Sequence, residues 1–159
     1  MFRDDFDRTL FCILLARTIK TAEWICRAFC LMTTHYHLLL DVNHNALQGG
    51  MQRLNGPYAQ RFNARHGRSG HLRGDRYTAK PVESDGHMLH ALRYIARNPV
   101  EAGMCESPSE WPWASYRGCA ELDAGFPFVD SSLLRAYFGP DRAEATKLLR
   151  AFVGDLPVV

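Results

Sequence analysis

Two histidines, His35 and His37, stand two positions apart in a segment whose polar and apolar residues alternate. The alternation predicts a β-strand over residues 35–42. Residues i and i+2 of a strand project from the same face, so the two imidazoles could converge on one metal ion. A His-x-His pair alone is weak evidence, because two partly exposed strand histidines without a ligand would give the same pattern.

A predicted helix, from Ser84 or Asp85 to about residue 98, carries a second pair of reactive groups. Tyr94 and Asn98 are four residues apart, so they lie on one face of this helix. A neighbouring apolar stripe would pack the helix onto the sheet. This stripe consists of Leu89, Leu92, Ile95 and Ala96.

Two imidazoles and the amide oxygen of Asn98 would form a metal site with nitrogen and oxygen ligands and open positions. Such a site suits Mg²⁺ or Mn²⁺, which retain waters and accept phosphate oxygens. The oxygen of Tyr94 could then attack a phosphodiester, giving a phosphotyrosine adduct and a free 3′-hydroxyl. The phenol needs a cation or a base nearby, and the metal, Arg93 or Arg97 could supply it. Alternatively, Tyr94 is an ordinary packing residue.

Positive charge is concentrated in residues 61–80, although the net charge of the chain is only +2. Six basic residues stand here against one acid, Asp75. The local charge is therefore +5 and the rest of the chain carries −3, which is +2 minus +5. Such a stretch is typical of a surface that binds DNA phosphates, and a solvated loop is the alternative. The predicted contacts are Arg61, Arg65, Arg68, Arg73, Arg76 and Lys80.

Three aromatic residues are candidate stacking platforms for unpaired bases. They are Tyr77, Trp111 and Trp113. For the two tryptophans, packing of the C-terminal segment onto the core is the better interpretation.

Hydrophobic periodicity predicts the elements that position these groups. Residues 4–20 form a helix, 24–32 and 35–42 two strands joined at Thr33-Thr34, and 45–66 a helix bent or broken by glycines and Pro57. Residues 77–82 form a short strand, the helix that carries Tyr94 ends before Pro99, and two short amphipathic helices lie in 130–153. This order predicts an α+β fold with an antiparallel sheet.

Composition limits the class of protein. The 159 residues suit one domain with a small appendage, and 47% apolar residues suffice for a core. The five cysteines contain no Cys-x-x-Cys pair, so we expect them to be reduced and buried. The longest apolar run, residues 10–16, is too short to span a bilayer. We expect a soluble, cytoplasmic protein with no membrane partner.

Four segments in a fixed order are more specific than any single motif. They are LMTTHYHLLL (31–40), FNARHGRSGHLRGDRY (62–77), LRYIARNPVEAG (92–103) and EWPWASY (110–116). The chain resembles the HUH-type single-tyrosine transposases, in particular their REP-associated branch. The resemblance implies a ferredoxin-like fold with appended C-terminal helices, and single-stranded or hairpin DNA as substrate in transposition. It also implies His35, His37 and Asn98 as metal ligands and Tyr94 as nucleophile.

We therefore expect a catalytic domain over residues 1–120 and a helical appendage over 121–159, which could serve DNA discrimination or a homodimer contact. Tyr58 is a rival nucleophile that lies on an apolar helix stripe and has no amide four residues later. A metal-dependent hydrolase of another kind would use the same histidines without a covalent intermediate.

Two features depart from the pattern of that family. Thr33-Thr34 precedes the first histidine where the family usually has Pro-Asn, which removes no ligand. The chain also begins at what resembles the first helix of the family. We therefore expect the first strand, which the family has near the middle of its sheet, to be missing, which would expose unpaired backbone groups. Three explanations stay open: the start is misassigned, another chain or a rearrangement fills the gap, or this copy is decaying. The alternative function is a truncated, catalytically inactive DNA-binding protein descended from such a transposase.

Overall fold

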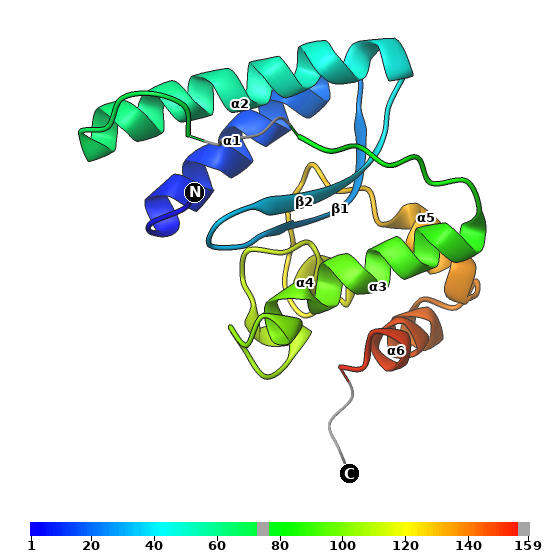
Figure 1. Cartoon of the computed structure of the whole chain (residues 1–159). Coiled ribbons are helices and arrows are strands. Elements are labelled where there is room, and N and C mark those ends of the chain that lie inside the picture. Colours follow the sequence, from blue (N-terminus) through cyan, green and yellow to red (C-terminus); the bar gives the residue numbers. More distant parts are fainter. Residues whose placement is uncertain (73–76, 156–159) are drawn as a thin grey trace. The chain divides into compact units, whose positions relative to one another are not determined.

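The structure, a computed structural model, describes residues 1–72 and 77–155. Within these residues it contains six α-helices and a two-stranded sheet, which confirms the α+β class (Figure 1). The elements are α1 (Asp5–Thr21), β1 (Ile25–Leu31), β2 (Tyr36–Asp41), α2 (His44–His66), α3 (Asp85–Glu101), the 3₁₀ turn η1 (Pro108–Glu110), α4 (Tyr116–Cys119), α5 (Ser132–Phe138) and α6 (Arg142–Val153). No described helix is both long and apolar enough to cross a membrane.

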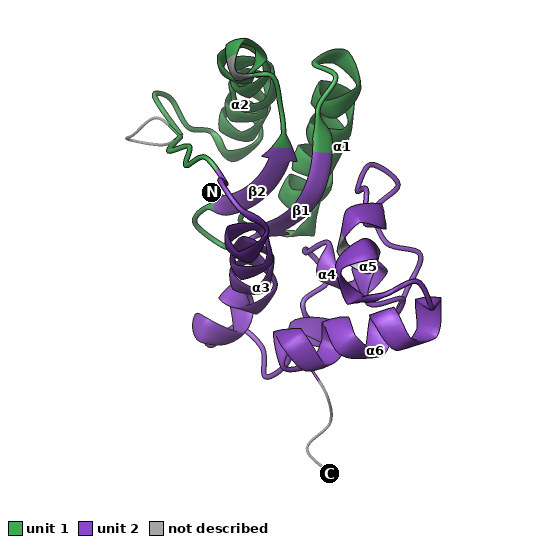
Figure 2. Ribbon diagram, turned by 90° about the vertical axis from the view of Figure 1, so that its right-hand side faces the viewer, with its two compact units in different colours: residues 1–25, 33–35, 41–81 green, residues 26–32, 36–40, 82–159 purple. Residues whose placement is uncertain are grey.

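The chain forms two compact units, shown in separate colours in Figure 2. Unit 1 comprises residues 1–25, 33–35 and 41–81, and unit 2 comprises residues 26–32, 36–40 and 82–159. The contacts do not divide the chain at residue 120, since α6 shares a core with α3. The expected boundary between a catalytic domain and an appendage stays a prediction.

In unit 1, α1 and α2 lie side by side around an aromatic core (Figure 1). Asp4 caps α1 by accepting a hydrogen bond from the backbone N–H of Asp7 at 3.0 Å. The rings of Phe11 and Tyr58 meet edge to face, with centroids 5.2 Å apart. The buried residues of α2 are Gly50, Met51, Leu54, Tyr58 and Phe62. The apolar stripe expected to contain Tyr58 therefore belongs to the buried face of this helix.

The sequence predicted a bent or broken helix here. Helix α2 runs without a break from His44 to His66, so the broken alternative is wrong. Pro57 lacks one backbone donor, but packing against α1 compensates for that loss. Gly50 has a different role. A Cβ atom built at this position would lie 2.0 Å from Cζ2 of Trp24, which is only 4% exposed. The glycine allows the helix to approach the indole closely.

Replacing Gly50 with alanine should therefore destabilise the protein by about 2 kcal/mol, because a methyl group cannot fit beside the Trp24 ring. Gly49 provides the matched control. Its Cβ would meet only the terminal nitrogen of Arg53, at 3.6 Å, so Gly49→Ala should stabilise the helix by up to about 1 kcal/mol. Urea denaturation of both variants measures these changes. Equal effects of the two substitutions would contradict this account.

The core of unit 2 lies where α3 packs against one face of the β1–β2 hairpin. Ala28, Cys30 and Met32 contribute from β1 and its end, and Leu39 from β2. The partners on the helices include Leu92, Ile95, Ala96, Tyr116, Cys119, Leu149 and Val153. On the opposite face of β1, the ring of Phe29 meets those of Phe126 and Phe128, with centroids 4.8 and 5.5 Å away. All five cysteines are free, and four of them are buried.

The second edge of β1 is covered by irregular backbone from later in the chain. The N–H of Leu31 donates to the carbonyl of Trp113 at 2.8 Å, and the N–H of Ser115 donates to the carbonyl of Phe29 at 2.9 Å. Farther along, the N–H of Asp130 donates to the carbonyl of Cys26 at 2.8 Å. These segments satisfy backbone groups that a further strand would otherwise pair.

Two predictions from the sequence are wrong: the strand at residues 77–82 and the end of the following helix before Pro99. Residues 77–83, predicted to include a strand, are all described and lie in irregular structure; residues 78–81 are exposed, and Pro81 lacks a donor. Helix α3 continues past Pro99 to Glu101. The N–H of Ala102 donates to the carbonyl of Asn98 at 3.0 Å, and that of Met104 to the carbonyl of Pro99 at 2.9 Å. One missing donor near the end is therefore tolerated.

Candidate active site

Tyr94 lies on α3 and is one of the few large hydrophobic side chains described in unit 2 that are exposed, at 52%. Its ring contacts the imidazole of His37 on β2, with centroids 5.3 Å apart and planes at 81°. Two residues 57 positions apart in the sequence are thus neighbours. The structure brings together one predicted metal ligand and the predicted nucleophile.

The local packing explains this contact. Leu39 is buried against Leu92, Ile95 and Ala96 of α3 in one core cluster. Because alternate strand residues share a face, His37 projects on the same side as Leu39 and reaches the helix one pleat earlier. The predicted stripe of α3 is confirmed at these three positions. Leu89 is only partly buried, and Met88 packs against the core in its place.

The other two predicted ligands occupy different surroundings. His35 lies just before β2 in unit 1, is half-buried, and its Nδ1 is 3.1 Å from Oγ1 of Thr34. Asn98 lies one helical turn after Tyr94 and is 9% exposed. Within residues 1–72 and 77–155, no group of three or more His, Cys, Asp or Glu side chains is arranged as a metal site. A metal site formed by the predicted ligands would therefore need the side-chain amide of Asn98 as its third ligand.

The two arginines that flank Tyr94 hold the C-terminus of α6. Nε of Arg93 donates to the carbonyl of Phe152 at 2.9 Å, and a terminal nitrogen of Arg97 donates to the carbonyl of Val153 at 3.0 Å. Cations at this end of a helix offset its dipole and satisfy its last carbonyls. At the start of α3, the hydroxyl of Tyr137 donates to the carboxylate of Asp85 at 2.7 Å. The C-terminal helices therefore fix α3 along its length.

A buried carboxylate that sequence reasoning missed, Asp155, anchors the end of α6. Its oxygens accept hydrogen bonds from the hydroxyls of Ser107, Ser109 and Tyr116, the last at 2.9 Å. Arg150 lies 3.6 Å away. Burial alone would raise the pKa of this carboxyl, but the hydrogen bonds from the serines and the tyrosine outweigh it and lower the pKa. An isolated aspartate near the chain end carries no sequence signal for this role.

The rival tyrosine, Tyr58, has no exposed surface. Its hydroxyl donates to the carbonyl of Met1 at 3.0 Å. Burial raises the pKa of this phenol, which opposes formation of the phenolate that attacks phosphorus. Tyr58 therefore functions as a core residue of unit 1.

The predicted DNA contacts divide into three groups. Arg61, Arg68 and Lys80 are exposed, as phosphate contacts require. Arg65 instead pairs with acids of unit 1, at 2.7 Å from Asp4 and 2.8 Å from Asp7. The remaining two predicted residues, Arg73 and Arg76, lie outside the described residues.

Asp7 gives Arg65 a structural role. Its side chain is 1% exposed, and it accepts hydrogen bonds from the backbone N–H of Arg3 at 2.8 Å and from His66 at 3.0 Å. Burial alone would raise the pKa of Asp7, but these hydrogen bonds together with that from Arg65 lower it. The charge of Arg65 is thus largely compensated within the protein.

Of the three candidate stacking residues, Trp111 packs against the core of unit 2 and donates from its indole nitrogen to the carbonyl of Leu31 at 3.0 Å. This confirms the packing interpretation for Trp111. Trp113 is half-buried, and its carbonyl pairs with β1. Tyr77 lines a cavity of unit 1.

Comparison with known proteins gives the family. The family model described as IS200-like transposase matches residues 1–98, more than half of the chain and the part that contains His35, His37, Tyr94 and Asn98. The chain therefore belongs to the IS200-like transposases and has the transposase function of a family that processes DNA. No curated protein and no solved structure matched the chain.

Proposed function

We propose that this protein is a metal-dependent, single-tyrosine DNA transposase that nicks single-stranded or hairpin DNA, as expected for the REP-associated branch. The contact between the rings of His37 and Tyr94 is the observation that carries this proposal. The family match over residues 1–98 supports action on DNA. Arg61, Arg68 and Lys80 are exposed and would contact phosphates, which gives salt-dependent affinity. Arg73 and Arg76 belong to the same basic stretch in sequence.

The donor set fits a divalent ion. His35, His37 and Asn98 would hold it, since two imidazoles and an amide oxygen suit Mg²⁺ or Mn²⁺. When bound, such an ion polarises a phosphodiester and offsets the charge that develops on its oxygens. The position of His37 beside Tyr94 supports this assignment, because the ion must lie near the attacking phenol.

The covalent step uses the phenol oxygen of Tyr94. As that oxygen forms a bond to phosphorus, its proton passes to solvent or a base. The bond between phosphorus and the 3′ oxygen breaks, and this oxygen leaves as a 3′-hydroxyl after taking up a proton. The product is a 5′-phosphotyrosine. Exposure of Tyr94 lets a DNA strand reach its oxygen, and the docking of Arg93 and Arg97 on α6 keeps the helix in place.

The direct test is incubation of the full chain with a labelled single-stranded hairpin DNA in Mg²⁺ or Mn²⁺, with EDTA as the control. We expect a covalent protein–DNA adduct on a denaturing gel that disappears in EDTA. Absence of the adduct from folded protein would overturn the proposal. Salt-sensitive binding that is indifferent to metal would then indicate an inactive DNA-binding protein. Cleavage without a covalent species would indicate a hydrolase of another kind.

A further inference from the structure

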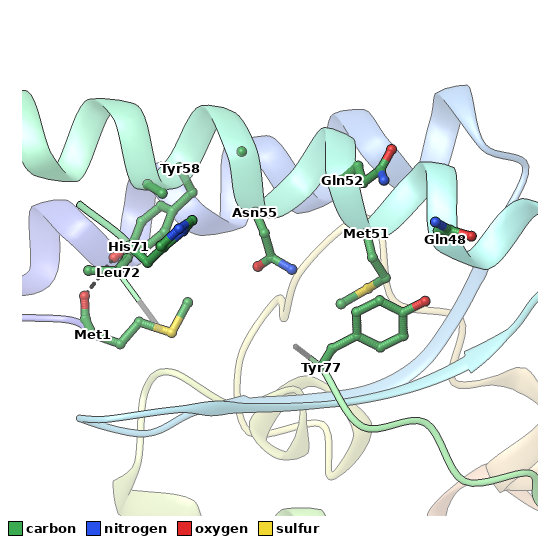
Figure 3. A pocket seen from close by; sticks show the side chains of 11 residues that line it. Met1, Gln48, Met51, Gln52, Asn55, Tyr58, His71, Leu72 and Tyr77 are labelled. Carbon is green, nitrogen blue, oxygen red and sulfur yellow. Dashed lines mark hydrogen bonds between the residues drawn. The ribbon is translucent and has the colours of Figure 1, made fainter. Parts of the chain in front are cut away.

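Unit 1 contains a cavity of about 890 Å³ lined by α2 together with Met1, His71, Leu72 and Tyr77 (Figure 3). The proposed chemistry makes no use of this space. Its size falls within the range of roughly 300–1,000 Å³ typical of ligand sites. Besides Tyr58, the side chains that decide its character are Gln48, Met51, Gln52, Asn55, His71 and Tyr77.

The lining combines an apolar floor with a rim of amides. Met51 is 4% exposed and Tyr58 is fully buried. Gln48, Gln52 and Asn55 follow one another at i, i+4 and i+7, so the three amides lie along one face of α2. Among the described lining residues no side chain carries a carboxylate, ammonium or guanidinium group, and the one charge is the N-terminal ammonium of Met1, which donates to the carbonyl of Thr33 at 3.0 Å. The part of a ligand that fits these lining side chains has a polar edge and an apolar face.

Figure 3 shows Asn55 and Met51 pointing from α2 into the space on whose far side Tyr77 lies. An asparagine amide has two donors and an acceptor oxygen with two lone pairs, so a partner within the protein leaves capacity for a ligand. A side-chain amide pairs with adenine by accepting from N6 and donating to N7. A phenol ring provides a surface on which a base can stack.

We propose that this cavity binds one unpaired nucleobase of single-stranded DNA, with adenine preferred. Tyr77 would stack on the base and Asn55 would read its edge. The inference rests on the proposed function for its substrate class and names a contact within that substrate. Phosphates on either side of the base would meet exposed cations, of which α2 carries Arg53 and Arg61.

The test measures DNA binding by fluorescence anisotropy in EDTA, so that no cleavage occurs. The probes are fluorescein-labelled thirteen-nucleotide thymidine strands whose central nucleotide carries adenine, cytosine, guanine, thymine or no base. We expect the adenine strand to bind the wild type about 10-fold to 100-fold more tightly than the abasic strand. Asn55→Ala should remove most of this difference. Gln60→Ala, an exposed amide on α2 outside the cavity, should retain it.

A second pair of variants separates stacking from folding. Tyr77→Phe keeps the ring and should bind like the wild type, whereas Tyr77→Ala should weaken binding of the adenine strand about 10-fold. The inference is overturned if the wild type does not distinguish adenine from abasic strands, or if Asn55→Ala distinguishes them as well as Gln60→Ala does. Adduct formation by Tyr94 is scored in a separate assay. Base discrimination without an adduct would refute the proposed function alone, and an adduct without discrimination would refute this inference alone.

Discussion

A Tyr94→Phe variant should form no detectable covalent adduct with hairpin DNA, a loss on the order of 10³-fold or more. Phenylalanine keeps the ring that contacts His37 but removes the hydroxyl that we propose as the nucleophile. Because Tyr94 is 52% exposed, the substitution should leave stability and DNA binding close to those of the wild type. A denaturing gel measures the adduct and fluorescence anisotropy measures the binding.

Tyr58→Phe is the matched control for this experiment. It removes the hydroxyl of the buried tyrosine and with it one hydrogen bond, at a cost of about 1 kcal/mol in stability. The adduct should form in this variant at the wild-type level. An undiminished adduct in Tyr94→Phe would exclude Tyr94 as the nucleophile. Loss of the adduct only in Tyr58→Phe would assign that role to Tyr58.

An Asp155→Ala variant should lose about 3 kcal/mol of unfolding free energy. The substitution leaves the buried hydroxyl of Tyr116 and two serine hydroxyls without their acceptor, and leaves Arg150 without its carboxylate. Urea denaturation followed by tryptophan fluorescence measures the change. Asp123→Ala, which breaks a surface pair with Arg117 at 2.6 Å, should cost less than about 1 kcal/mol.

The pH dependence of this difference has a defined sign. Since the pKa of Asp155 is lowered in the folded protein, its stabilising contribution is present at neutral pH and above the ordinary carboxyl pKa. That contribution is lost as the pH falls through the lowered pKa. The gap in stability between wild type and Asp155→Ala should therefore shrink below about pH 4. A gap that stays constant into acid would show that lost packing, rather than the carboxylate, accounts for the destabilisation.

Hydrophobic periodicity alone predicts the helices and strands whose residues follow one regular pattern. The strand that carries His37, the helix that carries Tyr94 and the buried face of α2 follow from alternation and helical spacing. Boundaries at Pro57 and Pro99 could not be predicted, because tolerance of a missing donor depends on packing around the helix. The prediction of a strand at 77–82 is wrong for a related reason. A strand needs a neighbouring strand for its backbone hydrogen bonds as well as a suitable sequence pattern.

The site was predictable in part. His37 and Tyr94, which the family resemblance implies act at one site, are neighbours in the structure. By contrast, the pairing of Arg65 with Asp4 and Asp7 depends on residues about sixty positions away. Charge composition cannot distinguish such an arginine from the exposed Arg61. The amides at 48, 52 and 55 do carry a signal, three polar groups on one helix face, which a search limited to charged and metal-binding residues overlooks.

The covered edge of β1 has a consequence for how the protein folds. Phe29 and Leu31 pair with residues more than eighty positions later, so this edge closes only after long stretches of chain have come together. Contacts of such sequence separation slow folding. Until they form, the hairpin presents open backbone groups that can pair with another molecule. During synthesis the first half of the chain emerges with this edge open, and that interval is when aggregation competes most strongly with folding.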